Sequence, residues 1–255
     1  VILVIVYHAD FIPGGFIGVD IFYVISGYLI TNLIIKEISI KGSLSLSNFY
    51  HRRIKRLLPA SALVLLATAL TCYILLPPMD RYQLGKDVIA VSLLLSNYAF
   101  AIWENDYQNL GEAASPFIHY WSLAIEEQFY LIWPFFILIF AKLGMKAVKI
   151  AILTLFVISL AFSIIQTSDS PIFSFYSLHT RAWELAAGAL IVFIPKNHPA
   201  LNKLIYKLCA ISGALLIIWA AYILTPESVF PGYLALIPVL GSFLLITSIG
   251  DWPVF

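Results

Sequence analysis

Two adjacent carboxylates lie in an otherwise apolar run, and this feature constrains the fold more than any other. The run covers residues 119–141, and Glu126 and Glu127 stand inside it. An ionised side chain at membrane depth costs at least a few kcal/mol, so such groups are shielded, paired or protonated. A helix that carries both glutamates therefore has to pack part of its surface against protein rather than lipid.

The composition of the whole chain agrees with a membrane protein. Of the 255 residues, 61% are hydrophobic and 11% are charged, and the mean hydropathy is +0.93, whereas about a quarter of the residues in a soluble domain carry charge. The formal net charge of +1, without a basic tail, gives no reason to expect a nucleic-acid partner. Cys72 and Cys209 lie in apolar runs, which favours small core residues over a disulfide or a metal site.

The apolar segments predict an all-α fold, a polytopic bundle of transmembrane helices, because each spanning helix needs roughly 20 mostly apolar residues. We expect about eight spans and one further helix that does not cross. The chain begins inside an apolar run without Met and stops soon after another, so we expect a fragment truncated at both ends. The candidate segments are 1–12, 17–35, 59–77, 88–103, 121–141, 150–167, 180–194, 208–224 and 233–249.

Lysine and arginine predict the orientation of these segments. They gather at 36–56, 142–149 and 196–207, and the positive-inside rule makes these loops cytoplasmic. The stretch 104–118 is acidic and has no Lys or Arg, as an outer loop does. Between the first two inner loops the chain must cross an even number of times, yet three apolar segments lie there. We therefore predict that 88–103, which is short, forms an interfacial or re-entrant helix on the outer side.

Polar residues mark the first two apolar segments. His8 and Asp10 lie at the outer end of the first segment, either as ordinary interfacial residues or as a catalytic pair. In the catalytic reading the imidazole takes a proton from a hydroxyl and Asp10 orients it. Asp20 stands about one turn into the second segment and has to find a partner. Ser26 and Gly27 follow it and favour close helix packing.

A cluster of cations precedes the segment 59–77. Arg52, Arg53, Lys55 and Arg56 fall within five residues. Anchoring to anionic lipid headgroups explains most such clusters. The alternative is a phosphate site, because Arg53 and Arg56 lie one helical turn apart, where two guanidinium forks can bind phosphate oxygens. A phosphorylated cytosolic donor would suit that site.

The run with the two glutamates supplies a further polar group. On a helix, Ser122, Glu126 and Tyr130 share one face and Glu127 points elsewhere, so at least one carboxylate is expected to face protein. The result is either an interhelical polar clamp or part of a functional site. The whole group is His119, Ser122, Glu126, Glu127, Gln128 and Tyr130.

The last polar group lies at the start of segment 180–194. It contains His179, Arg181 and Glu184. Arg181 and Glu184 are three residues apart, so they are expected either to pair along one helix or to share a polar pocket with Glu126.

Taken in order, these motifs resemble the acyltransferase-3 family, the OafA/YrhL-like membrane O-acetyltransferases that modify bacterial surface polysaccharide. The resemblance covers essentially the whole chain. It rests on five ordered motifs: Tyr7-His8-Ala9; Gly15–Phe22 leading to Ser26–Thr31; Phe49-Tyr50 followed by Arg52, Arg53 and Arg56; Trp121–Pro134; and His179–Glu184.

The resemblance implies a multi-pass O-acyltransferase of the bacterial inner (cytoplasmic) membrane. It implies transfer of an acetyl group from acetyl-CoA, a co-substrate rather than a bound cofactor, to a hydroxyl of a cell-surface polysaccharide, lipopolysaccharide or peptidoglycan precursor. Many relatives also carry a tenth helix and a periplasmic SGNH-type domain, both expected to be missing here.

The resemblance also implies roles for particular residues. His8 is the implied catalytic residue, as a general base or as a transient acyl carrier, and Arg53 and Arg56 are implied to contact acyl-CoA. We add Arg52 to the donor-binding set and predict Asp10, Asp20 and Glu126 as further catalytic residues. The predicted supporting pocket consists of Ser26, His119, Ser122, Glu127, His179, Arg181 and Glu184.

A second class of function fits the same buried charges. In a proton-coupled transporter or flippase of a glycolipid, a proton relay would be formed by His8, Asp20, Glu126 and Glu184. Such transporters often show internal repeats with broken helices. The sequence shows no self-similar halves, which favours the enzyme.

Overall fold

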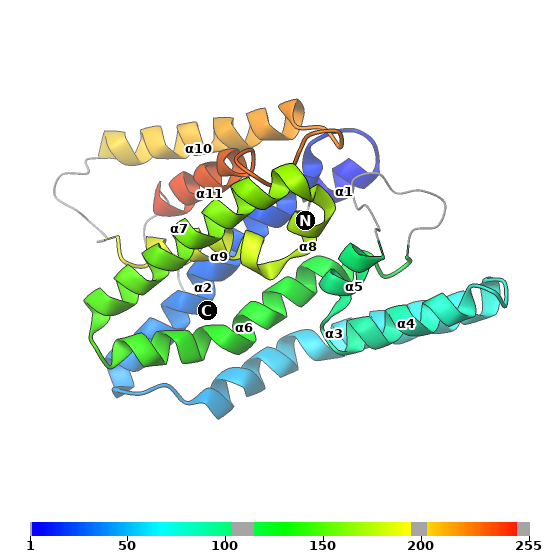
Figure 1. Ribbon diagram of the computed structural model, residues 1–255. Helices are drawn as coiled ribbons and strands as arrows, with labels where there is room; N and C mark the ends of the chain where they lie inside the picture. The colour runs from blue at the N-terminus through cyan, green and yellow to red at the C-terminus, as the bar shows by residue number, and fades with distance from the viewer. Residues whose placement is uncertain (1, 104–114, 195–202, 249–255) are drawn as a thin grey trace. The chain divides into compact units, whose positions relative to one another are not determined.

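A computed structural model describes residues 2–103, 115–194 and 203–248, and in these residues it contains helices and turns but no strand. The all-α prediction is therefore confirmed. Most of the predicted outer loop at 104–118 and of the predicted inner loop at 196–207 lies outside the described residues. In chain order the helices are α1 (Ile2–His8), η1 (Gly15–Ile17), α2 (Gly18–Lys41), α3 (Leu46–Leu75), α4 (Arg81–Ser92), α5 (Ser96–Ile102), α6 (Tyr120–Ala141), α7 (Met145–Asp169), α8 (Pro171–Tyr176), α9 (Leu178–Ile191), α10 (Lys203–Ile223) and α11 (Leu236–Ser248) (Figure 1).

The helices belong to two units, which are described separately below. The first unit consists of Val1–Leu33, Ile139–Phe175 and His179–Phe255, and the second of Ile34–Leu138 with Tyr176–Leu178. In the first unit, α10 and α11 pack side by side, and in the second unit α3 and α4 do so (Figure 1).

Five helices in the described part of the chain are long and apolar enough to cross a membrane. Two of these candidates, α3 and α6, fall between Lys41 and Lys142, and two crossings there would be the even number that the loop charges require. Three expected spans, 1–12, 180–194 and 233–249, instead contain the shorter helices α1, α9 and α11. The five candidates are Gly15–Lys41, Leu46–Leu75, Tyr120–Ala141, Met145–Asp169 and Leu204–Ile223.

The predicted single helix at 88–103 is wrong in its boundaries. Its residues belong to α4, which begins earlier at Arg81, and to α5, and Leu94 between them has a φ of 57°. The first part of α4 contains the charged residues Arg81, Lys86 and Asp87. This stretch is helical because Asp87, which is 1% exposed, accepts hydrogen bonds from Gln83 Nε2 (2.9 Å) and from Ser115 Oγ (2.5 Å). Neither helix is among the candidate spans, and an interfacial or re-entrant position stays a prediction.

Helix α3 also begins earlier than the predicted segment 59–77. Ser45 caps it, because the Ser45 Oγ accepts a hydrogen bond from the backbone N–H of Asn48 (3.4 Å). The cations at 52–56 are therefore helical, and Arg53 and Arg56 lie one turn apart on α3.

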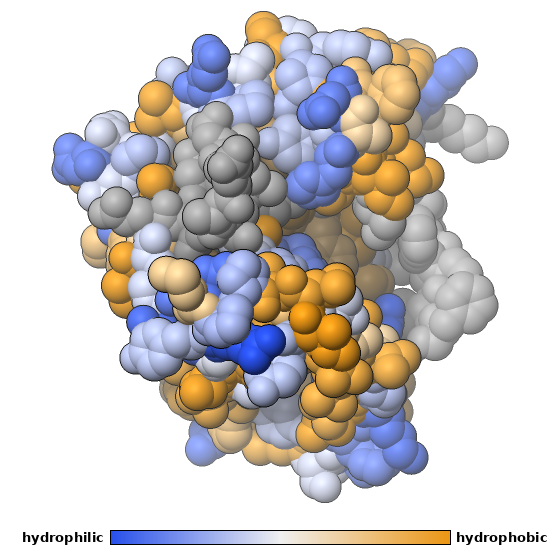
Figure 2. Space-filling view, turned by 90° about the vertical axis from the view of Figure 1, so that its right-hand side faces the viewer, coloured by the Kyte–Doolittle hydropathy of each residue, from blue (hydrophilic) through white to orange (hydrophobic). Residues whose placement is uncertain are grey.

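Much of the surface is apolar (Figure 2). The most apolar eighteen-residue window of α3 has no buried residue, and Leu66 on this helix is 68% exposed. Apolar exposure of this extent on a long helix is expected where the helix faces lipid.

Helix α9 differs from the long helices because it is short and almost wholly buried. Its 14 residues extend about 21 Å, and it meets α2 where each helix has a glycine. A Cβ atom on Gly27 would lie 1.9 Å from the Leu185 carbonyl oxygen, and one on Gly188 would lie 1.9 Å from that of Val24. The two backbones are in direct contact, so the predicted packing role of Gly27 is confirmed.

Candidate functional site

The first unit contains a charged cluster between α2 and α9. Arg181 Nη1 donates hydrogen bonds to Asp20 Oδ1 (2.9 Å) and to Glu184 Oε1 (2.7 Å), and all three side chains are 0% exposed. The predicted pairing of Arg181 with Glu184 is confirmed, and Asp20 has the partner that its position in an apolar helix requires. The supporting-pocket residue Ser26 is buried on the same helix as Asp20.

Aromatic rings surround the guanidinium of this cluster. The Arg181 Cζ lies 5.6 Å from the ring centre of Tyr23, 5.3 Å from that of Phe175 and 5.5 Å from that of Phe230. These rings exclude water, which strengthens the ion pairs, and they attract the cation through their π faces. Sequence reasoning missed all three rings, although Tyr23 carries a signal, since it follows Asp20 by three residues on one helix.

The charges of the cluster are engaged with one another. Two carboxylates share one guanidinium nitrogen, while Asp20 Oδ2 and Glu184 Oε2 are buried without a hydrogen-bond partner in the described residues. One proton shared by the two carboxylates would make the cluster neutral. The arrangement suits a clamp between α2 and α9 better than a site that binds an ionic ligand.

His179 lies outside this cluster although it begins the same helix. Its Nε2 is 2.6 Å from Gln166 Oε1, and its ring meets the Phe162 ring edge-on at 5.9 Å. Partial burial lowers the pKa of His179, which favours the neutral imidazole. The structure therefore assigns His179 a contact with α7 rather than a place beside Arg181.

His8 is the last residue of α1, and its side chain is exposed. The helix is held by an edge-on contact between the rings of Tyr7 and Phe16 at 5.7 Å. Asp10 lies in the following turn with a φ of 58°. An exposed imidazole is accessible to an acceptor hydroxyl, so the catalytic roles of His8 and Asp10 stay predictions.

In the second unit, the two glutamates of α6 have different partners. Glu126 is 3% exposed and accepts a hydrogen bond from the Tyr130 hydroxyl, so the predicted shared face of these two residues is confirmed. The Arg53 Cζ lies 5.1 Å from the Tyr130 ring centre and 6.0 Å from that of Phe49. Glu127 is close enough to Arg53 for electrostatic attraction. Arg53 is thus partly engaged by α6.

Arg52 is engaged by a different acid. Its Nη2 lies 3.2 Å from Glu37 Oε2, and Glu37 Oε1 accepts a hydrogen bond from the backbone N–H of Ser45 (3.4 Å). These contacts hold the turn between α2 and α3. The predicted donor-binding role of Arg52 therefore has less support from the geometry than a role in this turn.

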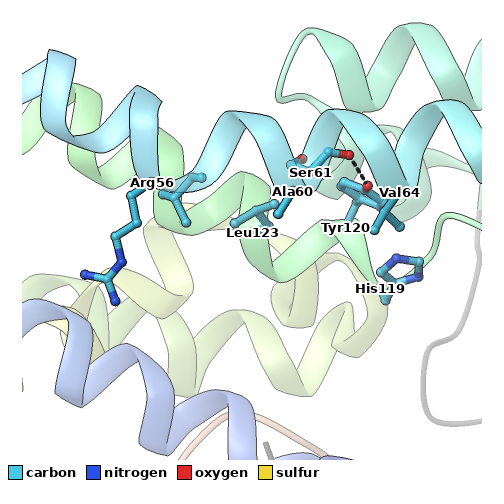
Figure 3. Close-up of a pocket in the computed structure, with 8 residues that line it drawn as sticks. Arg56, Ala60, Ser61, Val64, His119, Tyr120 and Leu123 are labelled. Atoms are coloured by element: carbon cyan, nitrogen blue, oxygen red, sulfur yellow. Dashed lines mark hydrogen bonds between the residues drawn. The ribbon is translucent and has the colours of Figure 1, made fainter.

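Arg56 lines a pocket between α3 and α6. The pocket has a volume of about 390 Å³, and Figure 3 shows Arg56 at one end and His119 at the other. The Tyr120 hydroxyl donates a hydrogen bond to the Ser61 carbonyl (2.8 Å) and so joins the two helices. Within the described part of the chain, Arg56 makes no hydrogen bond or ion pair. The remaining lining residues are Leu57, Ala60, Val64 and Leu123.

Two other polar side chains of α6 form hydrogen bonds within the protein. Ser122 Oγ donates to the His119 carbonyl (3.4 Å), and Gln128 Nε2 donates to Asn97 Oδ1 (2.9 Å). Asn97 Nδ2 in turn donates to the Tyr176 carbonyl (3.0 Å). Sequence reasoning missed Asn97, whose only signal is an amide within an apolar stretch, and Tyr120, which appears as one more aromatic residue.

Metal binding has no candidate in the described residues. No group of three or more His, Cys, Asp or Glu side chains there could hold a metal ion. Cys72 and Cys209 are both free and half-buried.

The fold and these contacts define an integral membrane helical protein with buried ion pairs and an arginine-lined pocket. The sequence matches the acyltransferase domain of the acyltransferase-3 family over residues 1–253. The chain belongs to this family.

Three relatives show how far the similarity extends. The chain is 34% identical to the peptidoglycan O-acetyltransferase OatA of Listeria monocytogenes over 97% of its own length and 42% of that protein. It is 39% identical to the O-acetyltransferase OatA of Staphylococcus aureus (76% of this chain, 33% of the relative) and 34% identical to the putative peptidoglycan O-acetyltransferase YrhL of Bacillus subtilis (82% and 34%). The chain thus spans less than half the length of these relatives. No solved structure matches it.

Proposed function

We propose that this chain is the membrane part of an O-acetyltransferase of the bacterial cytoplasmic membrane that acetylates peptidoglycan or its precursor, with acetyl-CoA as donor. The observation that carries the proposal is the 34% identity to a peptidoglycan O-acetyltransferase, which extends over 97% of this chain. The arginines of α3 add physical support, because they provide cationic groups for an anionic donor.

The donor is held by Arg53 and Arg56. Guanidinium groups bind phosphate oxygens with charge-assisted hydrogen bonds, and CoA carries several phosphates. The positive-inside rule places both arginines at the cytoplasmic side, where acyl-CoA is available. Arg56 contributes most, since Arg53 is partly engaged by Tyr130 and Glu127.

The transfer requires a base or a carrier, and His8 is the proposed residue. As a base, it takes the proton of the acceptor hydroxyl while that oxygen attacks the thioester carbonyl, the C–S bond breaks, and the CoA thiolate takes up a proton. As a carrier, its imidazole first forms an acyl-imidazole with release of CoA thiol. The hydroxyl then attacks the acyl carbon, the C–N bond breaks, and the imidazole leaves with the hydroxyl proton.

Asp20 and Glu126, which we predicted to be catalytic, are assigned positioning roles. Asp20 bonds Arg181 and Glu126 bonds Tyr130, so each acts through a partner.

The experiment uses the full-length protein in proteoliposomes without an ion gradient. Labelled acetyl-CoA binding and acetylation of a peptidoglycan precursor are measured for wild type, His8→Ala and the double variant Arg53→Ala/Arg56→Ala. We expect His8→Ala to bind donor but not transfer, and the double variant to lose binding. The control is Lys146→Ala/Lys149→Ala, which removes two cations from another predicted inner loop. Equal transfer by all four proteins would refute the proposal.

A further inference from the structure

We infer that the pocket between α3 and α6 holds the pantetheine arm and acyl group of the donor, with His119 at the acyl end. This inference rests on the proposed function and extends it, because it names a second histidine and a location for the neutral part of the donor. Four observations support it.

The first observation is the distribution of polar groups in the pocket. Arg56 lies at one end and His119 at the other, and Leu57, Ala60 and Leu123 form apolar walls between them (Figure 3). A ligand that fits this lining has an anionic group at one end, a mostly uncharged middle and a hydrogen-bonding group at the far end. A phosphopantetheine thioester has this order of groups.

The second observation is the length of the pocket. From Arg56 to Val64 on α3 is eight residues, or about 12 Å along the helix axis. The hydrogen bond from the Tyr120 hydroxyl to the Ser61 carbonyl joins the start of α6 to the middle of this stretch. His119, which precedes Tyr120, is therefore well separated from Arg56, and an extended arm rather than a small anion is needed to reach both.

The third observation is the difference between the arginines of α3. Arg52 pairs with Glu37, and Arg53 lies over Tyr130 and near Glu127. No acidic side chain lines the pocket, and Arg56 has no ion pair with any described residue. Arg56 is therefore the arginine whose charge is open to a ligand.

The fourth observation concerns the chemistry available at the far end. The Tyr120 hydroxyl donates to the Ser61 carbonyl, and the His119 imidazole carries a ring N–H. A hydrogen bond from it to the thioester carbonyl oxygen would stabilise the negative charge that develops when a nucleophile attacks. No bond to His119 forms or breaks in this role.

The test compares variants of the pocket with matched variants elsewhere in full-length protein in proteoliposomes. Ala60→Trp fills the pocket, and Leu66→Trp adds the same ring on another face of α3. We expect Ala60→Trp to raise the KM for acetyl-CoA at least tenfold and Leu66→Trp to leave it unchanged. Ala60→Leu, a smaller change, should give an intermediate KM, which guards against misfolding of the tryptophan variant.

Two further variants separate the ends of the pocket. Arg56→Ala should weaken binding of CoA and of acetyl-CoA equally, by tenfold or more, whereas Lys55→Ala, which removes the neighbouring charge that does not line the pocket, should not. His119→Ala should lower kcat at least tenfold with CoA binding unchanged, and His119→Gln, which keeps an N–H donor, should restore part of the rate.

The possible outcomes distinguish the inference from the proposed function. If the wild type transfers no acetyl group from acetyl-CoA, the proposed function fails and the inference with it. If the wild type is active but Ala60→Trp has the KM of Leu66→Trp and His119→Ala keeps the wild-type kcat, the inference alone is overturned. It is also overturned if Ala60→Trp removes co-purifying phospholipid without changing the KM, since the pocket would then be a lipid groove.

Discussion

Two arginines of this protein have opposite surroundings. Arg181, in the first unit, is fully buried, donates to two carboxylates and is enclosed by three aromatic rings. Arg56, in the second unit, lines an open pocket and has no acidic partner in the described residues. A ligand could bind Arg181 Nη1 only by breaking its two buried ion pairs, whereas a ligand that binds Arg56 displaces only the water around its guanidinium. Charge in an apolar helix is therefore paired and buried in one place and open to a pocket in the other.

The largest expected effect comes from removing the buried cation. Arg181→Met leaves Asp20 and Glu184 buried without their partner, and breaking a buried ion pair in this way costs about 3–5 kcal/mol. Lys41→Met removes an ion pair with Glu37 whose lysine side chain is 62% exposed, and it should cost less than about 1 kcal/mol. Thermal unfolding and the yield of monodisperse protein measure the difference.

A triple variant sharpens this test. Arg181→Met combined with Asp20→Asn and Glu184→Gln removes all three charges and should recover part of the stability lost in the single variant. If Arg181→Met were as stable as Lys41→Met, the cluster would not be a clamp, and the contrast with Arg56 would disappear.

The glycine contact between α2 and α9 gives the next largest effect. In Gly27→Ala the new Cβ would lie 1.9 Å from the Leu185 carbonyl oxygen, so the helices must separate, at a cost of about 1–3 kcal/mol. Gly85→Ala in α4 is the matched control, because no heavy atom lies within 4 Å of its Cβ position, and alanine there should stabilise the helix by up to about 1 kcal/mol. Equal melting temperatures for the two variants would contradict the close contact.

Local spacing predicted several features of the fold and site. The apolar runs predicted the helices because a backbone inside the bilayer must form its hydrogen bonds within itself. The spacing of three or four residues predicted the Arg181–Glu184 and Glu126–Tyr130 contacts. Helix geometry alone makes such residues neighbours. The partners of Asp20 and Arg52 depended instead on which helices pack together, which spacing along the chain does not encode.

Other features depended on tertiary contacts. Asp20 pairs with a residue 161 positions away, and Phe230 joins the same cluster from a distant segment. The early start of α4 depended on Gln83 and Ser115, which satisfy Asp87 and so allow a charged stretch to be helical. The one-turn spacing predicted a phosphate site at Arg53 and Arg56, to which we added Arg52, but spacing could not tell which of them has a protein partner, because those partners are set by the fold.

A smaller effect is expected for the contact between the Arg53 guanidinium and the Tyr130 ring in the second unit. Tyr130→Phe keeps the ring beneath the guanidinium and removes the hydroxyl, whereas Tyr130→Leu removes both. Because a cation–π contact contributes about 0.5–2 kcal/mol, Tyr130→Leu should weaken acetyl-CoA binding several-fold more than Tyr130→Phe. Equal affinities would show that Arg53 needs no orientation by α6, and Arg56 alone would then represent the open site.

The smallest effect is a change of stability with pH, and it tests a buried acid that makes no ion pair with any residue the structure describes. Burial raises the pKa of Asp87, whose hydrogen-bond partners are the neutral Gln83 and Ser115. The folded state then holds the proton more tightly than the unfolded state, so this contribution to stability is complete below the unfolded pKa and is lost as pH rises through the folded pKa. The slope of the unfolding free energy against pH cannot exceed about 1.4 kcal/mol per pH unit.

Asp87→Asn keeps the shape of the side chain and removes this dependence. The unfolding free energies of the two proteins, measured from about pH 4 upward, should therefore converge at the acid end and diverge above it. Parallel curves would mean that Asp87 stays ionised in the fold, and a buried acid without an ion pair would then be tolerated as readily as the paired acids beside Arg181.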